Sequence, residues 1–253
     1  MRWIYLSPHM DDAALCAGGL IHEQRRDGMD VEIWTLMCGV PQTDELSDYA
    51  LEMHEKWSTT TARQTVLLRR KEDRRAAAGL GVRAVHFDFL DALYRRGPDG
   101  EPLYGDPVGA PVHPEDRALP TELALAVESH LRPDDMIVCP LGIGEHVDHV
   151  LVRHAAEGLL QHPSYVADVP YVLNHPDELE PKTAGLRSVL QPISEAGLGA
   201  WLVAIESYSS QLSSLFDSRE RLRDGIRDYW EAEGGIRLWS AQAARLGAAQ
   251  AGS

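Results

Sequence analysis

The chain has 253 residues, of which 44% are hydrophobic, so it can bury a sizeable core, and we expect one domain spanning residues 1–253 with its last few residues disordered. Lys and Arg number 24 against 39 Asp and Glu, and the net charge of −15 argues against nucleic acid or an anionic membrane as a general partner. The sequence has neither an uncharged apolar stretch of about 18 residues nor a signal-peptide pattern, and its three cysteines lie far apart in apolar segments, so we expect a soluble, cytoplasmic protein without membrane insertion.

Apolar runs of strand length alternate with segments of helical period along the chain. In chain order the predicted elements are a strand at 3–6, a helix at 12–26, a strand at 31–37, helix at 49–78 in two pieces, a strand at 85–90, a helix at 121–131, a strand at 136–140, a helix at 149–160, strands at 166–173 and 186–190, and helices at 195–216 and 220–231. This alternation predicts an α/β domain with a mostly parallel sheet flanked by helices. The long loop at 96–120 is rich in proline and glycine, and a loop of that length is more often functional than idle.

Two clusters of histidine and aspartate follow predicted strands, where each strand gives way to a helix. The segments 9–12 and 146–149 come after the apolar runs at 3–6 and 136–139. In each cluster the outer residues are three apart across the start of a helix, so both side chains can face one point beyond the strand's carboxyl end. Because α/β proteins bind ligands at that edge of the sheet, the clusters predict one site built from two strand ends.

Imidazoles and carboxylates in this arrangement favour a catalytic metal. Two neutral imidazoles with one carboxylate are a familiar ligand set for catalytic zinc, which keeps a fourth position for water. Spacing offers His9 and Asp12 as ligands from the first cluster. It leaves the choice between His146 and His149 in the second cluster open. Asp11 is the acidic group left beside the metal, so we expect it to act as the general base that takes a proton from water.

Each cluster taken alone has a simpler interpretation. Asp11 or Asp12 would suit a helix N-cap beside a partly buried histidine, but two such clusters favour a shared metal site over coincidence.

Gly18 and Gly19 fail as a dinucleotide signature, because GxGxxG does not follow the first strand, and they would instead let the helix pack closely on the sheet. The remaining histidines have no partner spacing, and we expect them on the surface or as satisfied core residues: His22, His54, His86, His113, His130, His154, His162 and His175.

The two clusters resemble the signatures of a known family, the zinc-dependent de-N-acetylases related to N-acetylglucosaminyl-phosphatidylinositol deacetylase, also called PIG-L or LmbE-like proteins. The segment 9–13, His-Met-Asp-Asp-Ala, stands with Gly18-Gly19 where the family has His-Pro-Asp-Asp-Glu and a glycine pair. The segment 146–149, His-Val-Asp-His, matches the family's His-x-Asp-His in full. Further likenesses to the family are found at Arg69, Glu72, Ala76, Leu80 and Gly81, and at the tail segment 208–211, Tyr-Ser-Ser-Gln.

The resemblance implies a Rossmann-like fold and a definite ligand set. His9, Asp12 and His149 would bind zinc, although another divalent metal is compatible with the same donors. Met10 stands in place of the family's proline and Ala13 in place of its glutamate. Neither position is expected to bind metal, so the ligand set survives and only its surroundings differ.

The resemblance also assigns roles to the rest of the second cluster. His146 would stabilise the tetrahedral intermediate or protonate the leaving amine, and Asp148 would orient or tune His146. Some family members use a tyrosine two residues before the first histidine of this signature, but this chain has Gly144 there. Another group, such as Tyr94 or Tyr104, would have to assist the oxyanion.

The expected reaction is therefore zinc-dependent hydrolysis of an amide, which removes an N-acetyl or other N-acyl group from a small-molecule amino sugar or glycoconjugate. Arg69 and Asp91 are candidate substrate contacts, because they lie near strand ends where sugar hydroxyls would be reached. One alternative is an amidase that cleaves a larger thiol or sugar conjugate, favoured by a pocket that extends toward the loop at 96–120. The other is a non-catalytic metal-binding or nucleotide-binding module, favoured if Asp11 turns away from the metal or no pocket opens. The sequence leaves the oligomeric state open and is compatible with a homo-oligomer.

Overall fold

A computed structural model describes residues 1–216 and 218–241 of the chain, which form a single α/β domain. The predicted disorder of the last few residues lies outside this described part. The strands are β1 (Arg2–Ser7), β2 (Asp30–Thr35), β3 (Arg83–His86), β4 (Met136–Pro140), β5 (Ser164–Val166), β6 (Arg187–Pro192) and β7 (Gly235–Ser240). The helices are α1 (Asp12–Arg26), α2 (Asp48–Lys56), α3 (Ala62–Gly79), α4 (Leu119–Glu128), α5 (Val147–Glu157), α6 (Tyr171–Asn174), α7 (Leu179–Thr183), α8 (Glu195–Glu206), α9 (Leu212–Leu215) and α10 (Arg219–Glu231).

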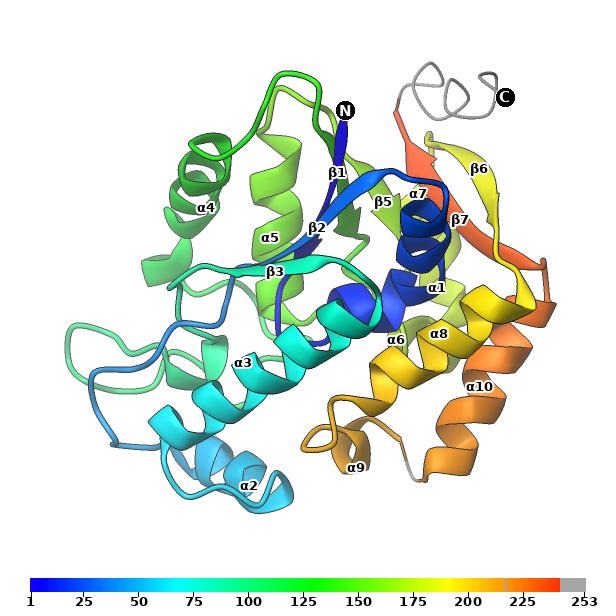
Figure 1. Cartoon of the computed structure of the whole chain (residues 1–253). Helices are drawn as coiled ribbons and strands as arrows, with labels where there is room; N and C mark the ends of the chain where they lie inside the picture. The colour runs from blue at the N-terminus through cyan, green and yellow to red at the C-terminus, as the bar shows by residue number, and fades with distance from the viewer. Residues whose placement is uncertain (217, 242–253) are drawn as a thin grey trace.

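The strands form one sheet in the order β3-β2-β1-β4-β5-β7-β6 (Figure 1). The first five strands of this order pair in parallel, and β7 pairs antiparallel with both β5 and β6. Central parallel strands are covered on both faces, which is why β1 and β4 consist almost wholly of buried residues. The strand order reverses its direction between β1 and β4, and ligands of open α/β sheets bind outside the carboxyl ends of the strands at such a point.

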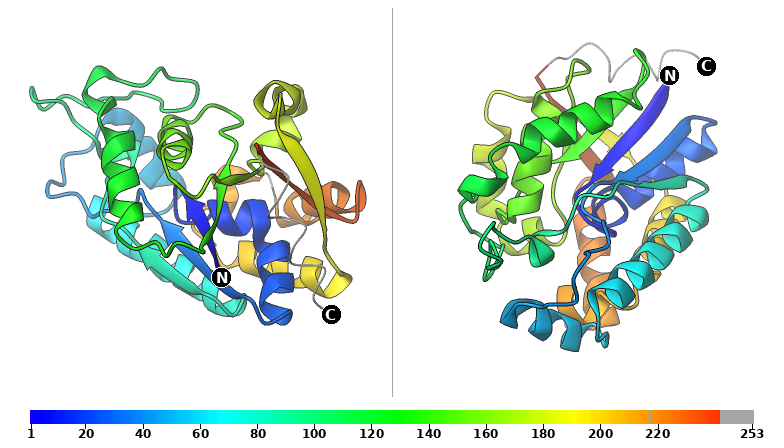
Figure 2. Two further views of the ribbon diagram at one scale, coloured as in Figure 1. Left: turned by 90° about the horizontal axis from the view of Figure 1, so that it is seen from above. Right: turned by 90° about the vertical axis from the view of Figure 1, so that its left-hand side faces the viewer.

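Helices cover the two faces of the sheet. Figure 2 shows α4 and α5 on one face and α1, α3 and α8 on the other. Gly18 and Gly19 let α1 approach α8 closely, because a Cβ at Gly18 would lie 2.7 Å from the Trp201 ring and one at Gly19 would lie 3.0 Å from it. The glycine pair therefore serves close packing as predicted, although the partner is a helix and not the sheet. Within the described part of the chain, no helix has both the length and the apolar character needed to cross a membrane.

Most predicted elements lie where the structure has them, but the region after residue 160 differs. The predicted strand at 166–173 is wrong: β5 ends at Val166, and Tyr171–Asn174 is the short helix α6. Pro170 has no N–H to donate to a ladder, so a strand cannot continue through it in the middle of a sheet. The predicted helix at 195–216 ends at Glu206, since the segment 208–211 bonds to side chains of α3 instead of continuing the helix. Strand β7 was not predicted.

Candidate active site

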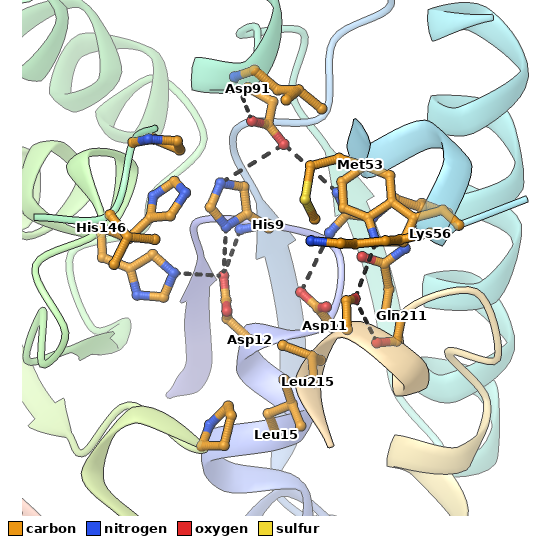
Figure 3. Close-up of a pocket in the computed structure, with 18 of the residues that line it drawn as sticks. His9, Asp11, Asp12, Leu15, Met53, Lys56, Asp91, His146, Gln211 and Leu215 are labelled. Carbon is orange, nitrogen blue, oxygen red and sulfur yellow. Dashed lines mark hydrogen bonds and ion pairs between the residues drawn. The ribbon is translucent and has the colours of Figure 1, made fainter. Parts of the chain in front are cut away.

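A cavity of about 650 Å³ opens at the carboxyl ends of β1 and β4, where the strand order reverses. Figure 3 shows its floor, with the Asp12 carboxylate pointing toward His9 and with Asp11 on the side of Gln211. The side chains that line it come from both clusters and from the surrounding loops: His9, Asp11, Asp12, Leu15, Tyr49, Met53, Lys56, Trp57, Arg69, Asp91, Leu93, Pro107, Val108, His146, His149, Pro170, Tyr171, Gln211, Ser213, Ser214 and Leu215.

The turn between β1 and α1 is held by hydrogen bonds that fix the first cluster. The Ser7 hydroxyl donates to the His9 carbonyl over 2.6 Å and accepts from the backbone N–H of Ala13 over 2.9 Å. The Asp12 carboxylate accepts the backbone N–H of His9 over 2.7 Å. The chain therefore enters α1 in one defined conformation, and the two aspartates at its start project to different parts of the cavity.

Two imidazoles converge on the Asp12 carboxylate. Its Oδ2 lies 3.4 Å from His9 Nδ1 and 3.3 Å from His149 Nε2. Burial would raise the pKa of Asp12, but the charges of His149 and His9 outweigh it and hold this pKa well below its usual range. One nitrogen each from His9, His146 and His149 lie within 4.8 Å of one another, which is the geometry of a group that could hold a metal ion.

The far side of each imidazole is bonded to a buried carboxylate. His9 Nε2 lies 3.0 Å from Asp148 Oδ2, and His149 Nδ1 lies 2.7 Å from Asp168 Oδ1. These contacts orient each ring so that its other nitrogen is directed at Asp12, as in the carboxylate–histidine–metal arrangement. Burial lowers the pKa of His149, but Asp12 and Asp168 raise it overall to about 10, so this ring sits in an environment that favours positive charge.

A second group, formed by His9, Asp91 and Asp148, also has metal-like spacing. However, its carboxylates already face cations: Asp148 Oδ1 lies 2.6 Å from Arg95, and Asp91 Oδ2 lies 3.6 Å from Arg69. Two guanidinium groups at this position oppose a further divalent charge. The donor set around Asp12 therefore fits a divalent metal better, and the second group acts to hold His9.

Asp11 is buried beside this donor set, with 5% of its surface exposed. Its Oδ1 lies 3.6 Å from a guanidinium nitrogen of Arg69. Burial raises the pKa of Asp11 and the charge of Arg69 lowers it, while nearby Asp12 raises it again, so that the pKa stands at about 6. A carboxylate with this pKa can both accept and return a proton near neutral pH.

His146 caps the N-terminus of α5. Its Nδ1 accepts the backbone N–H of Asp148 over 3.2 Å, which leaves the ring proton on Nε2. Burial and the neighbouring His9 hold the pKa of His146 well below its usual range, so the ring is neutral. The Asp148 carboxylate has different partners from the predicted one, since it bonds to His9, Arg95 and the backbone N–H of Ala92.

The two candidate substrate contacts both line the cavity. Arg69 comes from α3, and Asp91 precedes a short 3₁₀ turn (Ala92–Tyr94) and accepts the backbone N–H of Leu93 over 2.9 Å. The Arg69 guanidinium lies over the Trp57 ring at 5.0 Å, and its buried Nε has no hydrogen-bond partner within the described residues. Its terminal nitrogens lie 3.6 Å from Asp11 Oδ1 and from Asp91 Oδ2, so the guanidinium sits between two carboxylates of the cavity wall.

The tyrosines suggested from the sequence point elsewhere. The Tyr94 hydroxyl is bonded to His54 over 2.8 Å and that of Tyr104 to Asp116 over 2.7 Å, and neither residue is among those that line the cavity. Tyr171 lines it instead, with its ring 5.8 Å from that of His149. Gly144 has a φ of +79°, and a Cβ there would collide with the Tyr171 ring, so Tyr171 takes up the space beside position 144.

Sequence reasoning missed Asp168, Arg95 and Tyr171. Asp168 follows β5 just as Asp11 follows β1, so an acidic residue after an apolar run was the available signal, but the predicted strand ran through it. Arg95 joins Asp148 to Asp116, over 2.6 and 2.9 Å, and so ties the long loop to His9. No local pattern in the sequence marks that contact.

Comparison with known proteins places these features in one family. The family model described as "PIG-L: GlcNAc-PI de-N-acetylase" matches residues 4–160. The chain is 27% identical to 2'-N-acetylparomamine deacetylase from Niallia circulans, with 94% of this chain and 93% of that protein covered. Its structure is similar to that of the zinc-inhibited form of teicoplanin deacetylase, with a TM-score of 0.80, 29% identity, and 94% and 97% of the two chains covered. It is also similar to the A40926 pseudoaglycone deacetylase Dbv21, with a TM-score of 0.76, 26% identity, and 94% and 96% covered.

These homologues are deacetylases, which are hydrolases that act on C–N amide bonds. The described residues of this chain include three histidines with the spacing of a metal-binding group, and two of them lie within 3.4 Å of the Asp12 carboxylate, so the site suits a divalent metal.

Proposed function

This chain belongs to the PIG-L family of de-N-acetylases, and we propose that it is a zinc-dependent hydrolase that removes an N-acetyl group from an amino sugar or glycoconjugate. The observation that carries the proposal is the convergence of His9 and His149 on Asp12, with the buried carboxylate of Asp11 beside them. We assign His9, Asp12 and His149 as the metal ligands. Bound there, the ion would supply Lewis-acid activation of a water molecule and of the amide carbonyl.

Asp11 is the general base in this proposal. It accepts a proton from the attacking water as the new C–O bond forms, and its pKa of about 6 suits that task. The same proton then passes to the nitrogen as the C–N bond breaks, so that an acid and a free amine leave. Because Arg69 is the cation beside Asp11, it limits how far burial can raise the pKa of this carboxylate.

His146 donates a hydrogen bond to the developing oxyanion. Of the two roles that the sequence allowed, a neutral ring with its proton on Nε2 supports this one over proton transfer to the amine. The hydroxyl of Tyr171, which lines the same cavity, is a second donor for this oxygen. Asp148 acts on His9, because its carboxylate bonds to that ring.

Arg69 and Asp91 contact the sugar in this proposal. Both residues line the cavity, where they offer a guanidinium donor and a carboxylate acceptor for sugar hydroxyls. A volume of about 650 Å³ falls in the range of about 300–1,000 Å³ that suits drug-sized ligands, so it accommodates a conjugated sugar. The chemistry of the related teicoplanin and paromamine deacetylases is consistent with such a substrate.

The second candidate function is an amidase that acts on a larger conjugate, because the cavity reaches the long loop at Pro107 and Val108. An amidase that cleaves a bulky acyl group would use that extension. The cytoplasmic location and a homo-oligomer stay predictions from the sequence.

The test is a mass-spectrometric screen of zinc-loaded protein against N-acetylated amino sugars, free and conjugated, together with matched longer N-acyl forms. Loss of one acetyl group supports the deacetylase, and preferential cleavage of the longer acyl forms would select the amidase. The Asp11→Asn variant is the control for contaminating hydrolases. If the loaded parent cleaves no amide in the panel while that variant behaves identically, the proposed function fails.

A further inference from the structure

Glu72 of α3 is a buried carboxylate outside the metal group, with 3% of its surface exposed. Within the described part of the chain, no lysine, arginine or histidine forms an ion pair with it. Its oxygens instead accept three hydrogen bonds from two serines of the tail: from Ser209 Oγ at 2.8 Å, from Ser210 N at 2.9 Å, and from Ser210 Oγ at 2.6 Å. A buried charge is tolerated only where donors offset the loss of its hydration, so this carboxylate requires the tail in place.

The tail residues that follow these serines form one wall of the cavity. We name this wall the 211–215 wall, and its cavity-lining members are Gln211, Ser213, Ser214 and Leu215. Gln211 Nε2 donates to Ser210 Oγ over 2.9 Å, so the hydroxyl held by Glu72 also holds the carboxamide. Figure 3 shows Gln211 on the side of Asp11, across the cavity from His146.

A second tether fixes the other end of the wall. Trp57 Nε1 donates to Ser214 Oγ over 3.1 Å, and that hydroxyl donates to the Gln211 carbonyl over 2.8 Å. The Trp57 ring in turn lies against the guanidinium of Arg69. The wall is therefore held between α3 and the C-terminal end of α2. None of these hydrogen bonds involves His9, Asp12 or His149.

One helix carries both attachments. Arg69 and Glu72 are three residues apart on the buried face of α3, so Arg69 reaches Asp11 while Glu72 reaches the tail. The spacing between the reactive carboxylate and the 211–215 wall is thus set by a single rigid element. Asp11 and the wall line the same cavity, so a substrate held at Asp11 would also contact this wall.

We propose that Glu72 is a positioning residue that holds the 211–215 wall against the bound substrate and thereby sets substrate affinity. Its hydrogen bonds to Ser209 and Ser210 hold the wall in the conformation that closes the cavity beside Asp11. The part of this inference that concerns substrate rests on the proposed function, whereas the tether itself does not.

The test compares Glu72→Gln, Ser210→Ala and the control Lys71→Gln, which changes an exposed residue on the same helix. Glutamine keeps the shape of Glu72 but places an NH₂ group against serine donors, and Ser210→Ala removes the shared hydroxyl without altering a charge. In both variants KM should rise about tenfold while kcat stays within about twofold of the parent. Amide exchange in a peptide covering 209–215 should become faster in both, and Lys71→Gln should match the parent in each measurement.

Unchanged exchange at 209–215 in folded Glu72→Gln and Ser210→Ala proteins would overturn the tether. Faster exchange with an unchanged KM, or a fall in kcat alone, would overturn its role in affinity and leave a merely structural contact. If Glu72→Gln does not fold, Ser210→Ala carries both readouts. An inactive metal-loaded parent would instead count against the proposed function, and the exchange comparison would still decide whether Glu72 holds the wall.

Discussion

Asp11 is predicted to weaken the metal-free fold at neutral pH, and Asp11→Asn should therefore stabilise it. The pKa of this carboxyl rises from 3.8 to about 6 in the folded chain, mainly through burial. The unfolded chain thus releases this proton first, and ionisation favours unfolding as pH climbs from 3.8 through 6. Each pKa unit is worth about 1.4 kcal/mol, so the cost is about 3 kcal/mol at pH 8 and falls to about 0.5 kcal/mol at pH 4.

The assay is urea unfolding of the parent and Asp11→Asn after chelation, at pH 8 and again near pH 4. Other groups that titrate in this range are shared by both proteins, so the difference between the two free energies of unfolding reports the substitution of Asp11 together with its effect on the neighbouring charges. The variant should be the more stable protein at pH 8 by about 3 kcal/mol, with most of that gain absent near pH 4. A variant no more stable than the parent at pH 8, or a gain independent of pH, would show that ionised Asp11 does not destabilise the fold.

Four further substitutions test the metal site and its surroundings. Asp168→Asn replaces the carboxylate that bonds to His149 over 2.7 Å and should weaken metal binding about 10- to 100-fold in a competitive chelator titration; unchanged affinity would deny it that role. His149→Ala should lose most bound metal in elemental analysis, whereas His146→Ala should keep it and lower turnover about 10²-fold; the reverse pattern would exchange the two histidines. Tyr171→Phe should keep its metal and lower turnover by roughly 10²-fold in an acetate-release assay, and parent-like turnover would remove the tyrosine from the reaction.

Local patterns carried most of what could be predicted about the site. The two histidine clusters were recognised because each follows an apolar run at a strand-to-helix junction, and such junctions of parallel strands gather at one sheet edge. Spacing left the choice between His146 and His149 open, and the ligand assignment stays a prediction. The α/β alternation was equally local, since buried parallel strands are continuous apolar runs. For these features, the spacing of residues along the chain determines where they lie in the fold.

The features that the sequence did not predict depend on contacts between distant segments. Strand β7 reaches the sheet only from the end of the described chain and inserts between β5 and β6, and its short run Gly235–Ser240 has no alternation to mark it. The Asp148 carboxylate bonds to His9, which is 139 residues away in the sequence. His146 is only two residues away, yet it accepts a hydrogen bond from the backbone N–H of Asp148 and none involving the carboxylate. Which of two nearby groups a carboxylate selects is decided by side-chain orientation, which spacing does not determine.

We propose that Asp12 and two histidines hold the metal while Asp11 moves the proton. The most direct measurement is acetate release by Asp11→Asn and Asp12→Asn, each with its bound metal quantified in the same preparation. We expect Asp11→Asn to keep about one divalent ion per chain and to lose about 10²- to 10⁴-fold in turnover, whereas Asp12→Asn should lose the ion itself. Equal metal loss in the two variants, or an Asp11→Asn protein that turns over at the parent's rate with its metal bound, would contradict it.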